Sequence, residues 1–287
     1  MKSKDILLAF LVVTIWGSYF LVTKIALFSF PPMFLSGIRY LLLFVFTCAF
    51  LFKEKVPIKK IFLLSIVLFV NLVALNHAIL YSSNLAPIIL LNELTVPFSV
   101  ILGIYFLKEK VSLKDIIGII LAIIGSIVVI TIRSLESVNS IAIILIILAS
   151  ILFSFYNLIA KELSKFNSLT ILAYLSFFTF PQFLLLSYFQ ETWPNIEEIS
   201  LSSIIALLYI AIIVTLMGYY LWFYLLNKYP LNKVTPFTLL SPVIGCISSY
   251  YTFLEEKIDH IMIIGGAILI LGIIIIEYER DYGKKKL

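Results

Sequence analysis

The feature that most constrains the fold of this chain is its series of long apolar segments, separated by short polar ones. Each has roughly the 20 residues that an α-helix needs to cross the hydrocarbon core of a bilayer. With 62% hydrophobic and 13% charged residues, the chain leaves no polar stretch long enough for a soluble domain. We therefore predict an all-α integral membrane protein with ten transmembrane helices, over residues 5–28, 33–52, 61–82, 86–107, 114–132, 139–160, 168–189, 203–226, 233–254 and 261–278.

The positions of Lys and Arg predict which side of the membrane each connection faces. If both termini are cytoplasmic, 17 of the 21 basic residues lie in cytoplasmic segments, and only Arg133 and Lys257 lie in outer loops. Cytoplasmic loops of membrane proteins are rich in Lys and Arg, so this distribution predicts a multi-pass protein of the plasma or inner membrane with cytoplasmic N- and C-termini. It also explains the net charge of +5 without nucleic acid as a partner.

An internal repeat divides the chain into two halves. The stretch 16–24 recurs 137 residues later as 153–161, and four further positions recur after 147 residues, as the pairs Leu107/Leu254, Glu109/Glu256, Gly118/Gly265 and Gly125/Gly272. Because five helices per half is an odd number, the two halves must have opposite orientations. We predict two inverted five-helix repeats, 1–135 and 136–287. This is an architecture of secondary transporters, whose substrate site lies between the repeats near the membrane midplane.

Several motifs resemble the drug/metabolite transporter superfamily. They are WGSYFLVTK at 16–24, Arg39 in the second helix, and the L-x-E-K clamp followed by Gly after the fourth and ninth helices. Each half looks like an EamA-type domain of that superfamily. The stretches NELTVPFSVILGIYFLKEK and VTPFTLLSPVIGCISSYYTFLEEKI are most similar to exporters of amino acids such as cysteine and O-acetylserine. The resemblance implies a ten-helix exporter, although Glu93 stands where that branch more typically has Gln.

Four ionisable side chains fall at one predicted depth, about 6–10 Å below the outer surface for a helical rise of about 1.5 Å per residue. They are Lys24, Arg39, His77 and Glu93. Such residues are expensive inside a membrane and usually paired or functional. For Glu93 the sequence leaves open an ion pair with Arg39 or Lys24, direct contact with a zwitterionic substrate, or protonation coupled to transport.

The other candidates for substrate contact are polar and aromatic side chains within predicted helices. Packing within the protein is the alternative for each of them. On the helix 139–160 and just after it, a polar face of Ser150, Ser154, Asn157 and Lys161 either lines a path or forms interhelical hydrogen bonds. The resemblance implies that the helix 233–254 faces the central cavity, so a lining role is favoured for its polar face. The full set comprises Trp16, Tyr19, Asn76, Asn92, Asn157, Trp222, Thr238, Ser241 and Ser248.

Prolines occur within both the fourth and the ninth predicted helices, among them Pro97 and Pro242. A proline inside a helix removes a backbone hydrogen bond and favours a kink. Paired kinks in repeat-related helices would suit gating elements, and static kinks are the alternative.

The motifs of common enzymes do not occur in the sequence, and neither of its two His residues has neighbours at metal-ligand spacing. We therefore expect no catalysis, cofactor or metal. The favoured hypothesis is a secondary transporter that exports small polar metabolites by alternating access, with amino acids or their derivatives as the favoured substrates and protons as a candidate coupling ion. The alternatives are a broad exporter of drugs or amphipathic cations, with Glu93 as counter-ion, and a non-transporting lipid-handling or sensory membrane protein. The oligomeric state does not follow from the sequence.

Overall fold

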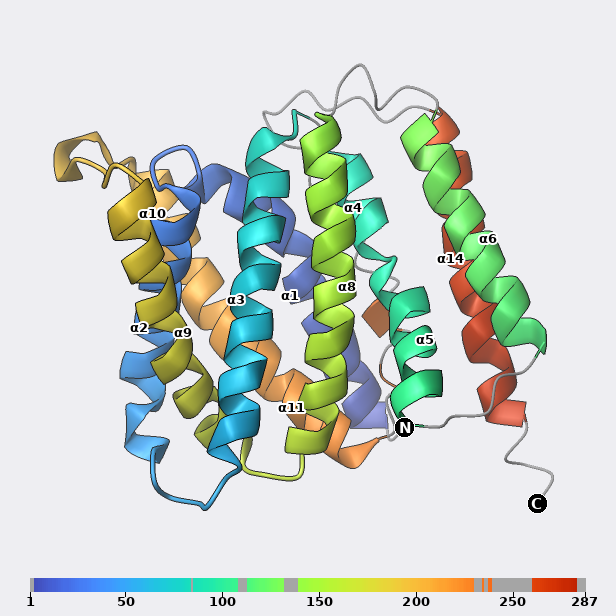
Figure 1. The fold of residues 1–287 in the computed structure, drawn as a ribbon, viewed down its shortest axis with the longest axis horizontal. Coiled ribbons are helices and arrows are strands. Elements are labelled where there is room, and N and C mark those ends of the chain that lie inside the picture. The colour runs from blue at the N-terminus through green and yellow to red at the C-terminus, as the bar shows by residue number, and fades with distance from the viewer. Residues whose placement is uncertain are drawn as a thin grey trace.

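The computed structural model describes residues 3–83, 85–107, 113–131, 139–229, 234, 237–238 and 260–282. All the regular elements in these ranges are helices (Figure 1). Among the described residues, six helical segments are long and apolar enough to cross a membrane, and three shorter apolar helices accompany them. The all-α membrane fold is thus confirmed. The count of ten spans is not, because most of the predicted helix 233–254 lies outside the described residues.

The helices alternate in direction along the chain, and α1 begins on the side where α14 ends (Figure 1). We call this side the N face. The span α10–η3–α11 is continuous, and its middle part, η3, is π-helical. In chain order the elements are α1 (Ser3–Ala26), α2 (Pro32–Thr47), η1 (Cys48–Phe50), α3 (Ile58–Tyr81), α4 (Leu85–Asn92), α5 (Thr95–Leu107), α6 (Leu113–Thr131), α8 (Ser140–Leu163), α9 (Ser168–Gln190), η2 (Ile196–Glu198), α10 (Leu201–Tyr209), η3 (Ile210–Met217), α11 (Gly218–Lys228) and α14 (His260–Tyr282).

The packing of the helices follows the internal repeat. The second helices of the two halves, α2 and α9, pack on each other, and so do the fifth, α6 and α14, at one edge of the bundle (Figure 1). The third helix of the first half, α3, packs on the first helix of the second half, α8. The repeat-related counterpart is the contact between the first helix of the first half, α1, and the third span of the second half, α10–η3–α11. A two-fold relation between the halves requires this pattern, so the two-repeat fold is confirmed.

Two lysines 137 residues apart make equivalent contacts in the two halves. Lys24, near the end of α1, donates to the carbonyl of Ile79 at the end of α3, at 2.9 Å. Lys161, near the end of α8, donates to the carbonyl of Leu226 at the end of α11, at 2.6 Å. These acceptors are 147 residues apart, the second offset found in the sequence. A cation at a helix C-terminus satisfies free carbonyls and complements the helix dipole. Lys161 lies at the N face and Lys24 at the opposite face, as inverted halves require.

A second repeat-related pair, Glu54 and Glu191, joins α2 to α9 at both faces of the bundle. Glu191 follows α9, and its carboxylate accepts hydrogen bonds from the backbone N–H groups of Met33 and Phe34 in α2, both at 2.8 Å. Glu54 follows α2 and accepts from the backbone N–H of Asn167, the N-cap of α9, at 2.9 Å. The N-terminus of a helix favours an anion because its first N–H groups are free. Each half thus supplies the carboxylate that caps the second helix of the other half.

Candidate functional site

Five aromatic rings, from the middle parts of α1 and α8 and from the first half of α11, form a cluster that we call the central aromatic cluster. Its members are Trp16, Phe153, Tyr156, Tyr219 and Trp222. The ring of Trp16 lies 4.9 Å from that of Trp222, 5.7 Å from that of Tyr219 and 6.2 Å from that of Phe153, between centroids. Trp16 and Phe153 are repeat-related, so the two halves meet in this cluster.

Three buried polar atoms in or beside the central aromatic cluster lack a hydrogen-bond partner among the described residues. They are the Tyr156 hydroxyl, the Trp222 indole N–H and the side-chain oxygen of Asn157. These residues are 0%, 1% and 3% exposed. An unsatisfied buried polar group costs about 1–3 kcal/mol, and such groups are rare in native proteins. Unused donors and acceptors among apolar rings are what a site for a small polar molecule provides.

Gly218 makes room for the indole of Trp16. A Cβ atom at position 218 would lie 2.7 Å from Trp16 Nε1, closer than side chains tolerate. Gly218 follows the π-helical segment η3, and π-helical turns occur frequently at functional sites. The backbone of α11 can therefore approach α1 closely at this level.

A polar chain begins at Arg39, which is 3% exposed on α2. Its Nε donates to the hydroxyl of Thr215 in η3, and its Nη1 donates to the Tyr19 hydroxyl at 3.3 Å. The Tyr19 hydroxyl donates to Asn76 Oδ1 at 2.9 Å, and Asn76 Nδ2 donates to the Ser36 hydroxyl at 2.7 Å. This chain connects three helices of the first half to the second half.

The fourth predicted span is broken at Glu93, between α4 and α5 (Figure 1). In an unbroken helix the nitrogen of residue 97 would donate to the Glu93 carbonyl, but Pro97 has no N–H and its ring would clash there. That carbonyl instead accepts from Val96 N–H at 3.0 Å, and Glu93 N–H donates to the Leu90 carbonyl at 3.2 Å. Pro97 is thus the third residue of a new helix. The predicted kink inside one helix is corrected to a division of the span.

Two serines of α8 form hydrogen bonds with the backbone at this break. The Ser150 hydroxyl lies 3.1 Å from the Leu91 carbonyl, and the Ser154 hydroxyl donates to the Thr95 carbonyl at 2.8 Å. Serine side chains commonly satisfy carbonyls that are freed where a membrane helix is interrupted. For these two residues the structure therefore supports the interhelical interpretation of the polar face.

Glu93 forms no ion pair within the described ranges, although its side chain is only 5% exposed. Lys24 binds carbonyls at the end of α3, and Arg39 binds Thr215 and Tyr19. Of the three interpretations left open for Glu93, the ion pair with Arg39 or Lys24 is therefore not found in the structure. Equal depth along the helices did not bring these groups together, because their side chains point toward different neighbours.

The structure distributes the remaining predicted site residues over several places. The ring of His77 is half-buried, and its Nδ1 lies 2.8 Å from the Val73 carbonyl of its own helix. Thr238 is half-buried, and Asn92 is the last residue of α4. Ser241, Ser248 and Pro242 lie outside the described residues. The substrate-binding roles of these residues stay predictions.

At the N face, Asp5 ties the beginning of α1 to the end of α11. Asp5 is 2% exposed, and its carboxylate accepts hydrogen bonds from Lys228 Nζ at 2.7 Å and from the hydroxyls of Tyr224 and Tyr229. We call these four residues the Asp5 lock. The sequence reasoning missed it, although Asp5 begins the predicted helix 5–28 and Lys228 follows the predicted helix 203–226 on the same predicted side of the membrane.

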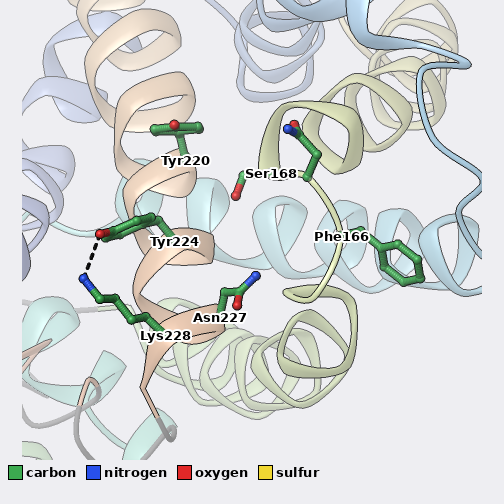
Figure 2. A pocket seen from close by; sticks show the side chains of 7 residues that line it. Phe166, Ser168, Tyr220, Tyr224, Asn227 and Lys228 are labelled. Carbon is green, nitrogen blue, oxygen red and sulfur yellow. Dashed lines mark hydrogen bonds between the residues drawn. The ribbon is translucent and has the colours of Figure 1, made fainter.

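An open hollow of about 390 Å³ lies beside the Asp5 lock (Figure 2). It is formed by Phe166 and Asn167 between α8 and α9, by Ser168 at the start of α9, and by four residues of α11, namely Tyr220, Tyr224, Asn227 and Lys228. Figure 2 shows the hydrogen bond from Lys228 to Tyr224 on its α11 side. None of the predicted substrate-binding residues lines this hollow.

Comparison with known proteins places this architecture among transporters. The EamA-like transporter family matches residues 3–131 and again residues 140–278. A "probable amino-acid metabolite efflux pump" of Salmonella typhimurium is 28% identical over 286 residues, covering 96% of this chain and 95% of the relative. The protein of the same description from Escherichia coli is 27% identical over the same shares.

Two further similarities also extend over most of both chains. The transporter YetK of Bacillus subtilis is 29% identical to this chain, and the alignment covers 92% of this chain and 84% of YetK. A solved crystal structure superimposes with a TM-score of 0.70 at 14% identity, covering 96% of both chains, and so shares the fold. Because the family matches both halves over almost their whole length, this chain belongs to the EamA-like transporter family, within the drug/metabolite transporter superfamily.

Proposed function

We propose that this protein exports small polar metabolites of the class of amino acids and their derivatives, by alternating access between its two repeats. The observation that carries the proposal is the broken span at Glu93, with a buried carboxyl group that has no cationic partner among the described residues. Broken helices form the substrate and coupling-ion sites of many transporters with inverted repeats. The names of the Salmonella and Escherichia relatives support the class of substrate.

The N face is the cytoplasmic face in this proposal. Lys53, Lys59, Lys60 and Lys165 lie in segments at that face, in keeping with the excess of basic residues in cytoplasmic loops. The Asp5 lock then closes the cytoplasmic end of the contact between α1 and α11. In contrast, the carboxylates of Glu54 and Glu191 hold α2 and α9 together at both faces. We infer that α2 and α9 stay together during transport, whereas the Asp5 lock opens to admit the substrate.

Glu93 is proposed to carry the coupling proton. A carboxyl group in an apolar site without a counter-charge is costly when ionised, so it would release its proton only where water or a cationic substrate reaches it. The test is counterflow of labelled L-amino acids in proteoliposomes across a range of pH values. Glu93→Gln should retain exchange but lose its pH dependence, whereas Glu198→Gln, in an exposed loop, should behave as wild type. Full pH dependence in Glu93→Gln would refute this role.

A broad exporter of organic cations is the second candidate, because the aromatic rings around Trp16 could bind a cation by cation–π contacts. Competition in the same proteoliposomes separates the two candidates. Inhibition by L-amino acids supports the first, and inhibition by quaternary amines alone supports the second.

A further inference from the structure

We infer that Arg39 is the receptor for the carboxylate group of the transported substrate. The inference rests on the proposed function and names the chemical group that the site recognises. Arg39 is a cation buried in the interior of the bundle, and no carboxylate contacts it within the described ranges. A buried charge that stays unpaired costs several kcal/mol or more, so a mobile anion is its natural partner.

The hydrogen bonds of Arg39 leave part of its guanidinium free. A guanidinium has five N–H donors in a planar fork. One donor, on Nε, binds the Thr215 hydroxyl, and one on Nη1 binds the Tyr19 hydroxyl. The three other donors have no partner in the described part of the chain. A planar fork with free donors matches the two oxygens of a carboxylate, which a lysine ammonium does not.

The surroundings of Arg39 hold the guanidinium without neutralising it. Its Cζ atom lies 5.1 Å from the ring centroid of Tyr19 and 5.4 Å from that of Tyr40. Such cation–π contacts stabilise a buried cation by about 0.5–2 kcal/mol and leave its charge in place. The Tyr19 hydroxyl is itself oriented by Asn76, to which it donates. Neutral groups therefore position the cation, and its charge remains available to an anion.

Arg39 also bridges the two repeats, where alternating access would expose a site to each side in turn. Tyr19 and Arg39 belong to the first half, and Thr215 belongs to η3 of the second. The Thr215 hydroxyl donates to the Ile210 carbonyl, five residues earlier, at 2.7 Å, so the π-helical turn sets its direction. A relative movement of the halves would change the geometry of the Nε hydrogen bond. Thr215 is accordingly a positioning residue for Arg39.

The test compares acids with their amides as competitors of counterflow in proteoliposomes that contain the full-length protein. The probes are the proteinogenic L-amino acids and the carboxamides of those that compete, which have the same shape without the negative charge. We expect wild type to prefer the acid at least tenfold. Arg39→Gln should abolish the preference, and Arg39→Lys should retain part of it. Thr215→Val leaves the charge in place and should reduce the preference severalfold, which keeps the test decisive if Arg39→Gln does not fold.

The outcomes separate this inference from the proposed function. Equal competition by acids and amides in wild type, or a full acid preference in folded Arg39→Gln, would overturn the role of Arg39 and leave transport standing. A loss of thermal stability without a change in the acid-to-amide ratio would show a structural role only, and would also overturn it. If no compound of the panel, acid or amide, is moved, the proposed function fails and this inference fails with it.

Discussion

The carboxylate of Glu191 allows a quantitative prediction, because three donors converge on it. Two are backbone N–H groups of α2, and the third is the Ser187 hydroxyl at 2.7 Å. Hydrogen bonds to a charged group contribute about 1.5–3 kcal/mol each when buried, and the partial exposure of Glu191 places them at the low end. We expect Glu191→Gln, which keeps one acceptor oxygen, to lower the free energy of unfolding by about 1–2 kcal/mol. Glu191→Ala should lower it by about 2–3 kcal/mol.

The assay is thermal unfolding of the purified full-length protein in detergent, followed by size-exclusion chromatography with fluorescence detection. The apparent Tm of Glu191→Gln should fall by a few degrees. Glu197→Gln, in the exposed element η2 of the same loop, is the matched control and should leave Tm unchanged. Glu54→Gln should have a smaller effect, since Glu54 is exposed and caps a single N–H group. The two losses should add, because the sites lie at opposite faces. A Tm of Glu191→Gln equal to that of the control would refute the reasoning.

Two further variants test the interior and the N face. Gly218→Ala places a Cβ atom 2.7 Å from Trp16 Nε1, so we expect the indole to shift. Tryptophan emission should change, and transport by the folded protein should be at least tenfold slower. Unchanged transport would show that the central aromatic cluster does not line the substrate path. Asp5→Asn weakens the Asp5 lock, so a cysteine introduced by Asn157→Cys in a cysteine-free background should react faster with thiol reagents added at the N face. Equal labelling rates with and without Asp5→Asn would show that the lock does not control access.

The spans and their repeat follow from the sequence because both depend on local properties of the chain. Apolar length determines which segments can cross a bilayer, and an odd number of helices per half makes the repeats inverted. The contacts of Lys24 and Lys161 agree with offsets read from the sequence alone. Trp16 and Trp222, two of the predicted substrate contacts, lie together in the central aromatic cluster, and their contact with substrate stays a prediction.

Pairing between charged groups was not predictable in the same way. Depth along a helix follows from residue number, whereas the direction of a side chain follows from how that helix is rotated against its neighbours. Glu93 and Arg39 therefore received the same predicted depth but have different surroundings in the structure. The break before Pro97 has a local cause, which is the missing N–H group of proline. Its backbone carbonyls also accept hydrogen bonds from hydroxyls of α8, and only the folded bundle brings α8 next to the break.

The sequence by itself thus determined a membrane-spanning, two-repeat helical protein with a buried carboxyl group and a buried arginine within its spans. Only the tertiary structure showed that Glu93 and Arg39 do not form an ion pair with each other. It also decided that Glu54 and Glu191 cap helices of the opposite half, and that Asp5 reaches Lys228 across the chain. The physical reason is the distance along the chain over which each property is set. The length of an apolar segment and the number of helices can be read from consecutive residues. Hydrogen bonds and ion pairs between distant residues form only after helix packing has brought their atoms within about 3 Å.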